Sequence, residues 1–269
     1  MLLKDKITLV TGAGRGLGQA VAVAYARHGA QVIATARTES ELERTAEMIR
    51  DAGGCAWTFS ADIALTSQVR QMAEQVLGEF GRIDVLVNNA ARLPLTLLEE
   101  TSLEEWDRTI TVNLRGPFLT CKLFLDNLKR RGGGSIINVS SRAGVEGFPR
   151  ETAYCASKFG LEGFSRALAM EFQEHNIAVN TITPGGVSHG VRIKPTSVTQ
   201  VQYDAMNEQE KAQWQDPMLL TEAFVYLALQ NARGITGERI YAYPLSERIR
   251  REGWDIDYIS ENTQQDGGK

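Results

Sequence analysis

The residues whose types and spacing could do chemistry are Tyr154 and Lys158, which stand four residues apart. They open a segment with helical periodicity, and residues four apart on a helix lie on the same face. A free tyrosine has a pKa of about 10 and exchanges protons poorly at neutral pH. A neighbouring cation favours the phenolate and lowers that pKa, so the pair is predicted to act as a general acid/base on a hydroxyl or carbonyl group. The alternative is a packed ring beside a solvated charge, and other features must decide between the two.

A serine that precedes Tyr154 by thirteen residues could complete this group. Ser141 closes a strand-like run that begins at Gly134. A strand end beside a helix start could place the serine hydroxyl against the phenol, where it would hold a carbonyl oxygen. The alternative is a plain turn, because a serine at a strand end is ordinarily a turn former.

A glycine-rich loop near the start of the chain predicts a phosphate site. Glycine lets the backbone turn tightly and approach a phosphate group, and a helix N-terminus presents free N–H groups to the anion. The loop follows an expected strand and leads into an expected helix, which is the context that a dinucleotide site requires. It is not a P-loop, since no Gly-Lys-Ser/Thr closes it, and the alternative is a turn without a ligand. Its sequence is Thr11-Gly12-Ala13-Gly14-Arg15-Gly16-Leu17-Gly18.

The end of the expected second strand predicts which dinucleotide binds. An acidic residue at this point binds the 2′-hydroxyl of NAD, whereas an arginine suits the 2′-phosphate of NADP. Here the strand ends at Arg37, with no carboxylate until Glu39. Arg15 could supply a second cation, because the guanidinium group matches phosphate oxygens well. We therefore expect NADP(H) to be preferred over NAD(H); the alternative is that Arg37 is only a solvated strand end.

The elements that must position these residues alternate between strand and helix along the chain. Such alternation predicts an α/β fold, with a Rossmann-like doubly wound parallel sheet of about seven strands flanked by helices on both faces. No internal repeat and no linker interrupts the pattern, so one domain is expected over residues 1–259. Strands are expected near 7–11, 31–36, 55–60, 84–88, 134–139, 177–183 and 238–243, and helices near 16–28, 39–52, 66–80, 103–130, 152–175 and 217–230.

Two segments late in the chain do not follow this alternation. The polar stretch 189–216, with an expected helix near 199–214, would cover the substrate as a lid, or is a plain surface excursion. Residues 260–269 have a disordered composition. Between them, residues 246–259 are expected to pack on their own subunit or on a neighbour, because they include the apolar Trp254, Ile256, Tyr258 and Ile259.

Composition narrows the class of protein. The chain has 269 residues and a net charge of −4 with acids and bases mixed along it, so no nucleic-acid surface is expected. It contains no long uncharged apolar stretch, and its first residues carry no signal-peptide pattern. The three cysteines and three histidines are scattered without metal-ligand spacing. We therefore expect a cytoplasmic protein with reduced thiols and without a metal site.

Between Thr11 and about Gly237, the chain resembles the short-chain dehydrogenase/reductase family of the single-domain type. The resemblance depends on motifs that occur together, in the order and at the spacing of the family. They are the glycine loop, Asp62, Asn88-Asn89-Ala90, Asn113, Ser141, Tyr154 with Lys158, and Pro184-Gly185.

The resemblance implies a reaction in which a hydride moves between the nicotinamide and a substrate carbonyl or carbinol carbon. Tyr154 would be the catalytic acid/base, and Lys158 would lower its pKa and bind the nicotinamide ribose. Ser141 would hold the substrate oxygen, and Asn113 would support a proton-relay water. The residues that the resemblance assigns to the cofactor are Gly12, Arg15, Gly16, Leu17, Gly18, Arg37, Asp62, Ile63, Asn89, Ala90, Tyr154, Lys158, Pro184, Gly185, Val187 and Ser188.

The sequence departs from the family pattern at three places. Ala91 replaces a glycine, and His189 stands where a carboxamide-binding threonine is common, so that Ser188 could substitute for it. The ending after Gly237 is rebuilt over residues 244–259. Because of these departures, the family pattern does not determine the shape of the substrate entrance or the subunit contacts of this chain.

The substrate is a small carbonyl or alcohol compound whose identity the sequence leaves open. Arg92, Arg142 and Arg150 could bind a carboxylate or phosphate on it, or could be solvated surface groups. The leading interpretations are a 3-oxoacyl-thioester reductase and a sugar or polyol dehydrogenase. The alternatives are a non-catalytic NADP(H)-binding redox sensor and a lyase or epimerase on the same scaffold. The resemblance also implies a homo-oligomer, dimer or tetramer, assembled through the helices at 103–130 and 152–175.

Overall fold

A parallel sheet of seven strands forms the centre of the computed structural model, which describes residues 1–185, 192–194, 198 and 203–258. The strand order is β3-β2-β1-β4-β5-β6-β7, and each pair of neighbours runs in the same direction. This confirms the predicted Rossmann-like sheet. The strands are β1 (Ile7–Thr11), β2 (Gln31–Ala36), β3 (Cys55–Ser60), β4 (Val85–Asn88), β5 (Gly134–Val139), β6 (Ile177–Thr183) and β7 (Arg239–Tyr241).

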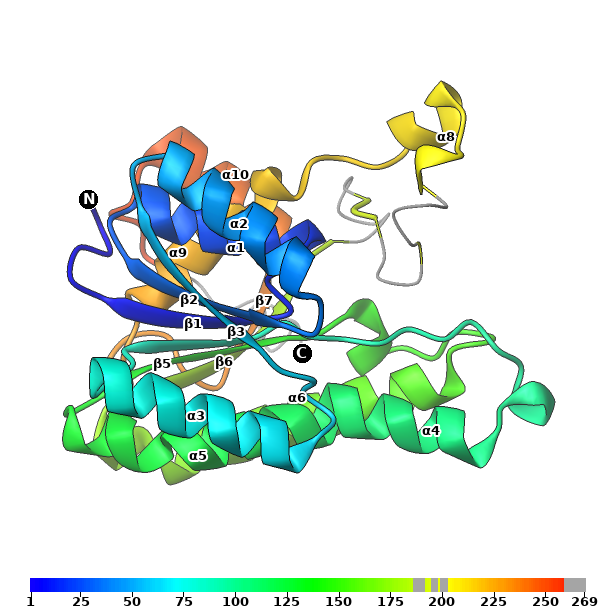
Figure 1. Ribbon diagram of the computed structural model, residues 1–269, viewed down its shortest axis with the longest axis horizontal. Helices are drawn as coiled ribbons and strands as arrows, with labels where there is room; N and C mark the ends of the chain where they lie inside the picture. Colours follow the sequence, from blue (N-terminus) through cyan, green and yellow to red (C-terminus); the bar gives the residue numbers. More distant parts are fainter. Residues whose placement is uncertain (186–191, 195–197, 199–202, 259–269) are drawn as a thin grey trace, which may run out of the picture.

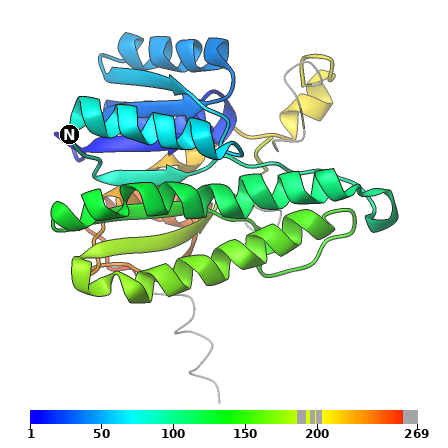
Figure 2. The same cartoon turned by 60° about the horizontal axis from the view of Figure 1, so that its bottom comes forward.

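Helices cover both faces of the sheet (Figures 1 and 2). One face carries α1 (Gly16–Arg27), α2 (Glu39–Asp51), α9 (Thr221–Ala228) and α10 (Ala242–Glu252). The other face carries α3 (Thr66–Phe80), α4 (Leu103–Ile110), α5 (Gly116–Arg130) and α6 (Thr152–Glu171). The short helix α8 (Glu208–Ala212) stands away from both layers (Figure 1).

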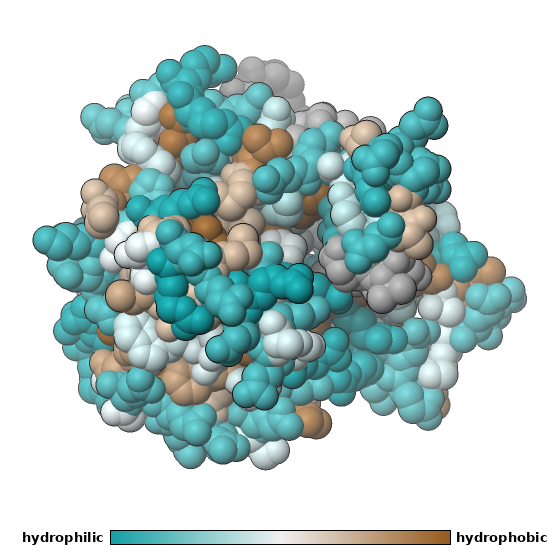
Figure 3. Space-filling model, turned by 45° about the horizontal axis from the view of Figure 1, so that its top comes forward, coloured by the Kyte–Doolittle hydropathy of each residue, from teal (hydrophilic) through white to brown (hydrophobic). Residues whose placement is uncertain are grey.

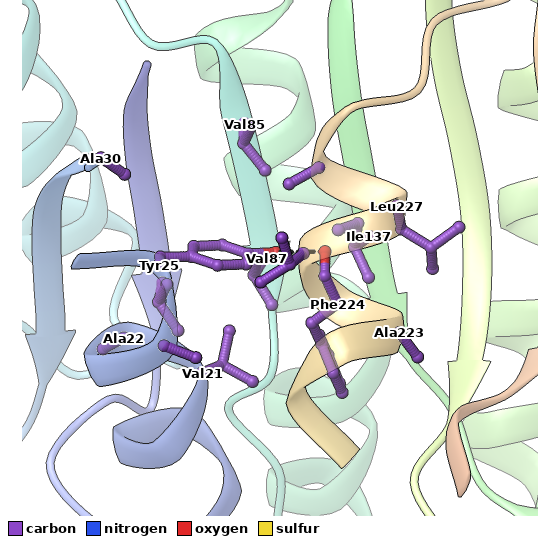
Figure 4. Close-up of a cluster of buried hydrophobic side chains, with 14 of the residues drawn as sticks. Val21, Ala22, Tyr25, Ala30, Val85, Val87, Ile137, Ala223, Phe224 and Leu227 are labelled. Carbon is purple, nitrogen blue, oxygen red and sulfur yellow. Dashed lines mark hydrogen bonds between the residues drawn. The ribbon is translucent and has the colours of Figure 1, made fainter. Parts of the chain in front are cut away.

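The core fills the space between the sheet and its helices. Every residue of β1, β4 and β6 is buried and none is charged, as expected for parallel strands that are covered on both faces. On the α1 and α9 face, the side chain of Tyr25 lies among apolar side chains of the sheet and of α9 (Figure 4). Its hydroxyl group donates a hydrogen bond of 3.0 Å to the carbonyl oxygen of Phe224, so the buried phenol is satisfied.

The strand order places a topological switch point beside β1. β1 pairs with β2 on one side and with β4 on the other, so the chain leaves β1 and β4 in opposite directions across the sheet. In open parallel sheets, ligands bind at the carboxyl ends of the strands where the order reverses. The glycine loop and the segment after β4 lie at this edge of the sheet.

Two of the expected helices have additional detail in the structure. The helix expected over 103–130 is present, and a π-helical turn at Thr111–Arg115 lies between its α4 and α5 parts. Within the range 199–214, where one helix is expected, the described residues include the short helix α8 (Glu208–Ala212), and residues 199–202 lie outside the described residues.

The ending of the chain is also different from the prediction. The strand expected at 238–243 ends at Tyr241, and the unpredicted helix α10 begins at the next residue. The aromatic residues at 241 and 243 favour a strand, whereas Leu245 and Ile249, four residues apart, are buried on one face of α10. Pro244 lies in the first turn, where its missing N–H breaks no helical hydrogen bond.

The segment that follows α10 packs on its own chain. Ile256 is buried, and its carbonyl oxygen accepts a hydrogen bond of 2.8 Å from the hydroxyl group of Tyr226 in α9. The Trp254 ring meets the edge of His28 at the end of α1, with 5.2 Å between ring centroids. No helix in the described part of the chain has the length and apolar content needed to cross a membrane.

Candidate active site

A cleft of about 1010 Å³ opens at the carboxyl ends of the central strands. Hydrophilic residues cover most of the molecular face in Figure 3. Asn113 is buried outside the cleft lining, and Val187 and Ser188 lie outside the described residues. The remaining predicted site residues line the cleft: Gly12, Arg15, Gly16, Leu17, Gly18, Arg37, Asp62, Ile63, Asn89, Ala90, Ser141, Tyr154, Lys158, Pro184 and Gly185.

The glycine loop has the close backbone packing that a phosphate cradle needs. Gly12 and Gly16 have φ values of 66° and 58°, in the left-handed region that favours glycine. A Cβ atom on Gly18 would lie 2.3 Å from the carbonyl oxygen of Gly12, whereas one on Gly16 would meet no atom within 4 Å. The first turn of α1 holds no acidic side chain, so its free N–H groups can serve an anion.

Hydrogen bonds from the segment after β4 fix the shape of this loop. The side-chain amide of Asn89 donates to the carbonyl oxygens of Thr11 and Gly12, at 2.9 and 3.1 Å. In return, the Thr11 hydroxyl oxygen accepts hydrogen bonds from the backbone N–H groups of Asn89 and Ala90, at 3.0 and 3.1 Å. The segment after β4 therefore pre-organises the loop.

The corner of the cleft beyond β2 carries both signs of charge. Arg15 and Arg37 both line the cleft. Glu41, in the first turn of α2, also lines it and lies 3.5 Å from the guanidinium group of Arg15. The sequence analysis did not single out Glu41. The signal that could have found it is its position two residues after Glu39, in the first turn of the same helix.

Asp62 is held by its neighbours at the next point of the cleft. Its Oδ1 atom accepts a hydrogen bond of 3.0 Å from the backbone N–H of Ala64, and its Oδ2 atom accepts one of 2.5 Å from Arg108 of α4. Arg108 also lines the cleft. No sequence motif indicates this arginine, because its proximity to Asp62 depends on how α4 packs.

Tyr154 and Lys158 lie on the first two turns of α6, as the four-residue spacing predicted. The Lys158 ammonium group is buried and donates a hydrogen bond of 2.7 Å to the carbonyl oxygen of Val139, at the end of β5. It lies 5.5 Å from the centre of the Tyr154 ring. Ser141, in extended backbone just after β5, lines the same cleft, and its hydroxyl oxygen accepts a hydrogen bond of 3.2 Å from the N–H of Ala143.

The pKa of Tyr154 differs from the lowered value that its pairing with Lys158 predicts. Burial raises the pKa of Tyr154 to about 12, against the lowering effect of its hydrogen bond with Ser141, and the nearby Glu151 and Cys155 raise it further. Burial lowers the pKa of Lys158 to about 8, and the charge of Glu162 acts in the opposite direction. The expected lowering of the Tyr154 pKa is therefore not found, because desolvation of the phenolate has the largest effect on it.

The side chain of Asn113 forms hydrogen bonds with backbone groups and does not line the cleft. It lies on the π-helical turn between α4 and α5 and is 1% exposed. Its side-chain oxygen accepts a hydrogen bond from the N–H of Arg92, and its amide donates to the carbonyl oxygen of Arg92, both at 2.8 Å. The amide also donates to the Ser157 hydroxyl at 3.0 Å. Asn113 thereby ties the segment after β4 to α6, beside Tyr154 and Lys158.

The three arginines expected near the substrate already have partners in the structure. Arg92 pairs with Glu105 at 3.0 Å, and Arg150 donates to the carbonyl oxygen of Leu95. Arg142 lies 3.5 Å from Glu146 and over the ring of Phe148, 4.7 Å from its centre. Glu151, a cleft residue that sequence reasoning missed, has its pKa raised by burial, and Arg142 opposes that change.

Comparison with known proteins gives the class to which this fold and site belong. The family model for short chain dehydrogenases matches residues 6–198, which is more than half of the chain. The chain belongs to the short-chain dehydrogenase family of oxidoreductases, as the motifs predicted.

Individual relatives cover much of the chain. It is 32% identical to the 3-oxoacyl-(acyl-carrier-protein) reductase FabG of Thermotoga maritima over 241 residues, which are 89% of this chain and 97% of the relative. It is 41% identical to the D-threitol dehydrogenase of Mycolicibacterium smegmatis over 182 residues, which are 68% of this chain and 70% of the relative. The crystal structure of a metagenomic short-chain oxidoreductase in complex with NADP has a TM-score of 0.76 and 31% identity, covering 90% of this chain and 98% of that one.

These findings and the geometry of the cleft agree on a nicotinamide cofactor. The backbone cradle at Gly12 and Gly18 leaves no room for side chains, and the space beyond Gly16 is open. Such a cradle fits the phosphates of a dinucleotide, which binds at the N-terminus of the first helix in this fold. The protein is an oxidoreductase that acts on a small molecule.

Proposed function

We propose that this protein is an NADP(H)-dependent oxidoreductase that interconverts a carbonyl group and a secondary alcohol, with Tyr154 as the acid/base. The observation that carries the proposal is that Ser141, Tyr154 and Lys158 line one cleft, with the buried Lys158 ammonium group 5.5 Å from the centre of the Tyr154 ring. The glycine cradle lines the same cleft, so a dinucleotide and a substrate oxygen can meet there.

The nicotinamide, when bound, supplies the hydride for carbonyl reduction or accepts it from the alcohol. During reduction, the hydroxyl groups of Ser141 and Tyr154 donate hydrogen bonds to the carbonyl oxygen and orient it. As the carbon gains the hydride, the electron pair of the C=O π bond moves to oxygen, which takes the proton of Tyr154. The charge of Lys158 stabilises the phenolate that remains, and alcohol oxidation reverses each of these steps.

The pKa of Tyr154 suits the reduction direction. Because burial raises this pKa to about 12, the phenol holds its proton at neutral pH and is ready to donate it. For oxidation the phenolate must form first, which the same burial opposes. We therefore expect carbonyl reduction to be the faster direction near neutral pH, measured as NADPH consumption against NADP+ reduction on one substrate pair.

The preference for NADP(H) is proposed from Arg15 and Arg37 at the corner of the cleft. Replacing an arginine that binds a phosphate removes a charge-assisted hydrogen bond, which corresponds to about a tenfold to hundredfold loss of affinity. Arg37→Ala should weaken NADPH binding by that factor and leave NADH binding nearly unchanged. Arg50→Ala, on an exposed position of α2, is the matched control. Equal NADPH affinity in Arg37→Ala and wild type would refute the assignment.

For the substrate, the reading with most support is a 3-oxoacyl-thioester reductase, because the match to such a reductase runs along nearly the whole chain. A sugar or polyol dehydrogenase is the second candidate, supported by the threitol dehydrogenase relative and by the polar groups of Arg142 and Glu151 in the cleft. A panel of acyl thioesters, ketones, sugars and polyols, followed at the cofactor absorbance in both directions, distinguishes the two.

Tyr154→Phe tests the catalytic proposal. It removes the proton donor and keeps the ring, so cofactor should still bind while turnover is lost. If neither wild type nor Tyr154→Phe consumes NADPH on any substrate while both bind it, the protein is a redox sensor without catalysis. Equal, non-zero NADPH consumption by the two would refute the acid/base role of Tyr154. Product formation without net cofactor oxidation would instead identify a lyase or epimerase.

We also propose that the protein is cytoplasmic and forms a homo-oligomer, either a dimer or a tetramer. Light scattering would measure the mass of the assembly.

A further inference from the structure

A cluster of buried polar side chains packs against the residues of the proposed reaction from outside the cleft. Glu162 lies on α6, one turn after Lys158, and is 4% exposed. Its Oε1 atom accepts a hydrogen bond of 2.5 Å from the Ser140 hydroxyl, and its Oε2 atom accepts one of 2.8 Å from the Thr181 hydroxyl of β6. The carboxylate is therefore hydrogen-bonded through both oxygens and isolated from solvent.

Arg239 of β7 completes the cluster. Its Nη1 atom pairs with Oε1 of Glu162, and its Nη2 atom donates a hydrogen bond of 2.8 Å to the backbone carbonyl oxygen of Ser141. The side chains of Arg239 and Glu162 are only 8% and 5% exposed. Burying two charges costs several kcal/mol per ion before their attraction is counted, so such a pair is weak evidence for a role in stability. Its contacts with Ser141 and α6 point to a role in the site.

We propose that Glu162 and Arg239 are positioning residues of the reaction: Arg239 holds the backbone of Ser141, and Glu162 maintains the charge of the Lys158 ammonium group. The inference rests on the proposed function of Ser141, Tyr154 and Lys158. Neither Glu162 nor Arg239 lines the cleft, so each acts through a neighbour and touches no substrate.

The contact at Ser141 fixes a turn that depends on close packing. The Ser141 carbonyl oxygen also accepts a hydrogen bond of 2.9 Å from the N–H of Gly144, which closes the turn after β5. A Cβ atom on Gly144 would lie 2.8 Å from the Ser140 hydroxyl oxygen and 3.0 Å from Cγ of Glu162. The turn after β5 therefore packs directly against Glu162. Arg239 donates a hydrogen bond to the carbonyl oxygen of Ser141 in this turn.

The charges around Lys158 give the second half of the argument. The groups that face Glu162 are Lys158 on its own helix, Arg239 from β7, and the hydroxyl groups of Ser140 and Thr181. Burial lowers the pKa of Lys158, and the carboxylate of Glu162 raises it. Arg239 neutralises part of that carboxylate charge. Removing the anion and removing the cation must therefore move the pKa of Lys158 in opposite directions.

The test uses Glu162→Gln and Arg239→Met in the full chain, with kcat for carbonyl reduction measured as a function of pH. Reduction needs charged Lys158, so kcat falls as the pH rises through the Lys158 pKa. Glu162→Gln should move this fall to lower pH, and Arg239→Met to higher pH, each by about one pH unit. The same opposite shifts should appear in an NMR titration of the Lys158 ammonium nitrogen in cofactor-free protein.

A third variant separates charge from geometry. Arg239→Lys keeps the positive charge and loses the fork that reaches the Ser141 carbonyl oxygen. It should keep the pH dependence of wild type and lower kcat by about tenfold or more, because small misplacements of a catalytic group cost that much. Wild-type kcat in Arg239→Lys would overturn the role assigned to the contact with Ser141.

A control and two outcomes keep the inference separate from the proposed function. Glu222→Gln makes the same change in the exposed pair of Glu222 with Arg250, 2.8 Å apart between α9 and α10, and should leave kcat and its pH dependence unchanged.

A lower melting temperature with no movement of the pH profile or the NMR titration in Glu162→Gln would refute the positioning role. If Arg239→Met does not fold, Glu162→Gln and Arg239→Lys decide. Activity retained by Tyr154→Phe would refute the proposed function instead.

Discussion

Replacing Gly18 by alanine is the sharpest test of the phosphate cradle. The added Cβ atom would lie 2.3 Å from the carbonyl oxygen of Gly12 and 2.4 Å from the side-chain nitrogen of Asn89. Neither atom is the free end of a flexible side chain, since the first is backbone and the second donates hydrogen bonds to Thr11 and Gly12. The loop must therefore move.

The size of the effect follows from what moves. Overpacking a tight site costs about 1–3 kcal/mol, and each of the two Asn89 hydrogen bonds that weakens adds about 1 kcal/mol. The sum is roughly 2–5 kcal/mol of unfolding free energy, which corresponds to a fall in melting temperature of about 5–20 °C for a protein of this size. Because the same loop would hold the phosphates, NADPH affinity should fall by about a hundredfold or more.

The assays are thermal unfolding with and without NADPH, and a fluorescence titration of NADPH. Gly163→Ala is the matched control: this glycine lies within α6, where a Cβ atom would meet nothing within 4 Å. There the added methyl group should leave NADPH affinity unchanged and raise stability by about 0.5–1 kcal/mol. A Gly18→Ala protein with wild-type melting temperature and NADPH affinity would show that the loop does not form the cradle described.

Three further outcomes are expected. Tyr25→Phe should lower the unfolding free energy by about 1–2 kcal/mol in urea, because the carbonyl oxygen of Phe224 loses its buried donor. Glu151→Gln should lower the pKa of Tyr154 by removing a charge that raises it, so the pH at which alcohol oxidation becomes fast should move to lower values. The folded-state pKa of Lys158, about 8, lies below its ordinary value of 10.5, so wild type carries a stability penalty below pH 8 that is relieved as the pH rises toward 10.5. Relative to Lys158→Met, wild type should therefore gain up to about 3 kcal/mol across this range in urea unfolding.

The sequence was sufficient for the sheet and for residues whose positions follow from a local motif. The strand before the glycine loop, the alternation of elements and the four-residue spacing of Tyr154 and Lys158 all report on neighbours along the chain. Asn113 shows the limit of this reasoning: its motif located it, but its contacts with Arg92 and Ser157 depend on a π-helical turn that no periodicity reveals. The helix α10 was missed because aromatic residues at its start favour a strand.

Long-range contacts account for the remaining differences, and the cluster behind Ser141 shows why. Glu162 stands four residues after Lys158, so its place on the same face of α6 could have been read from spacing alone. Arg239 is 77 residues further along the chain, and only the pairing of β6 with β7 brings it to the carboxylate. An isolated glutamate on a helix is ordinarily a solvated charge. Glu162 is instead buried in an ion pair with an arginine that is distant in the sequence, and spacing along the helix does not reveal that partner. The rebuilt ending over residues 244–259 thus follows the strand whose arginine donates a hydrogen bond to the carbonyl oxygen of Ser141.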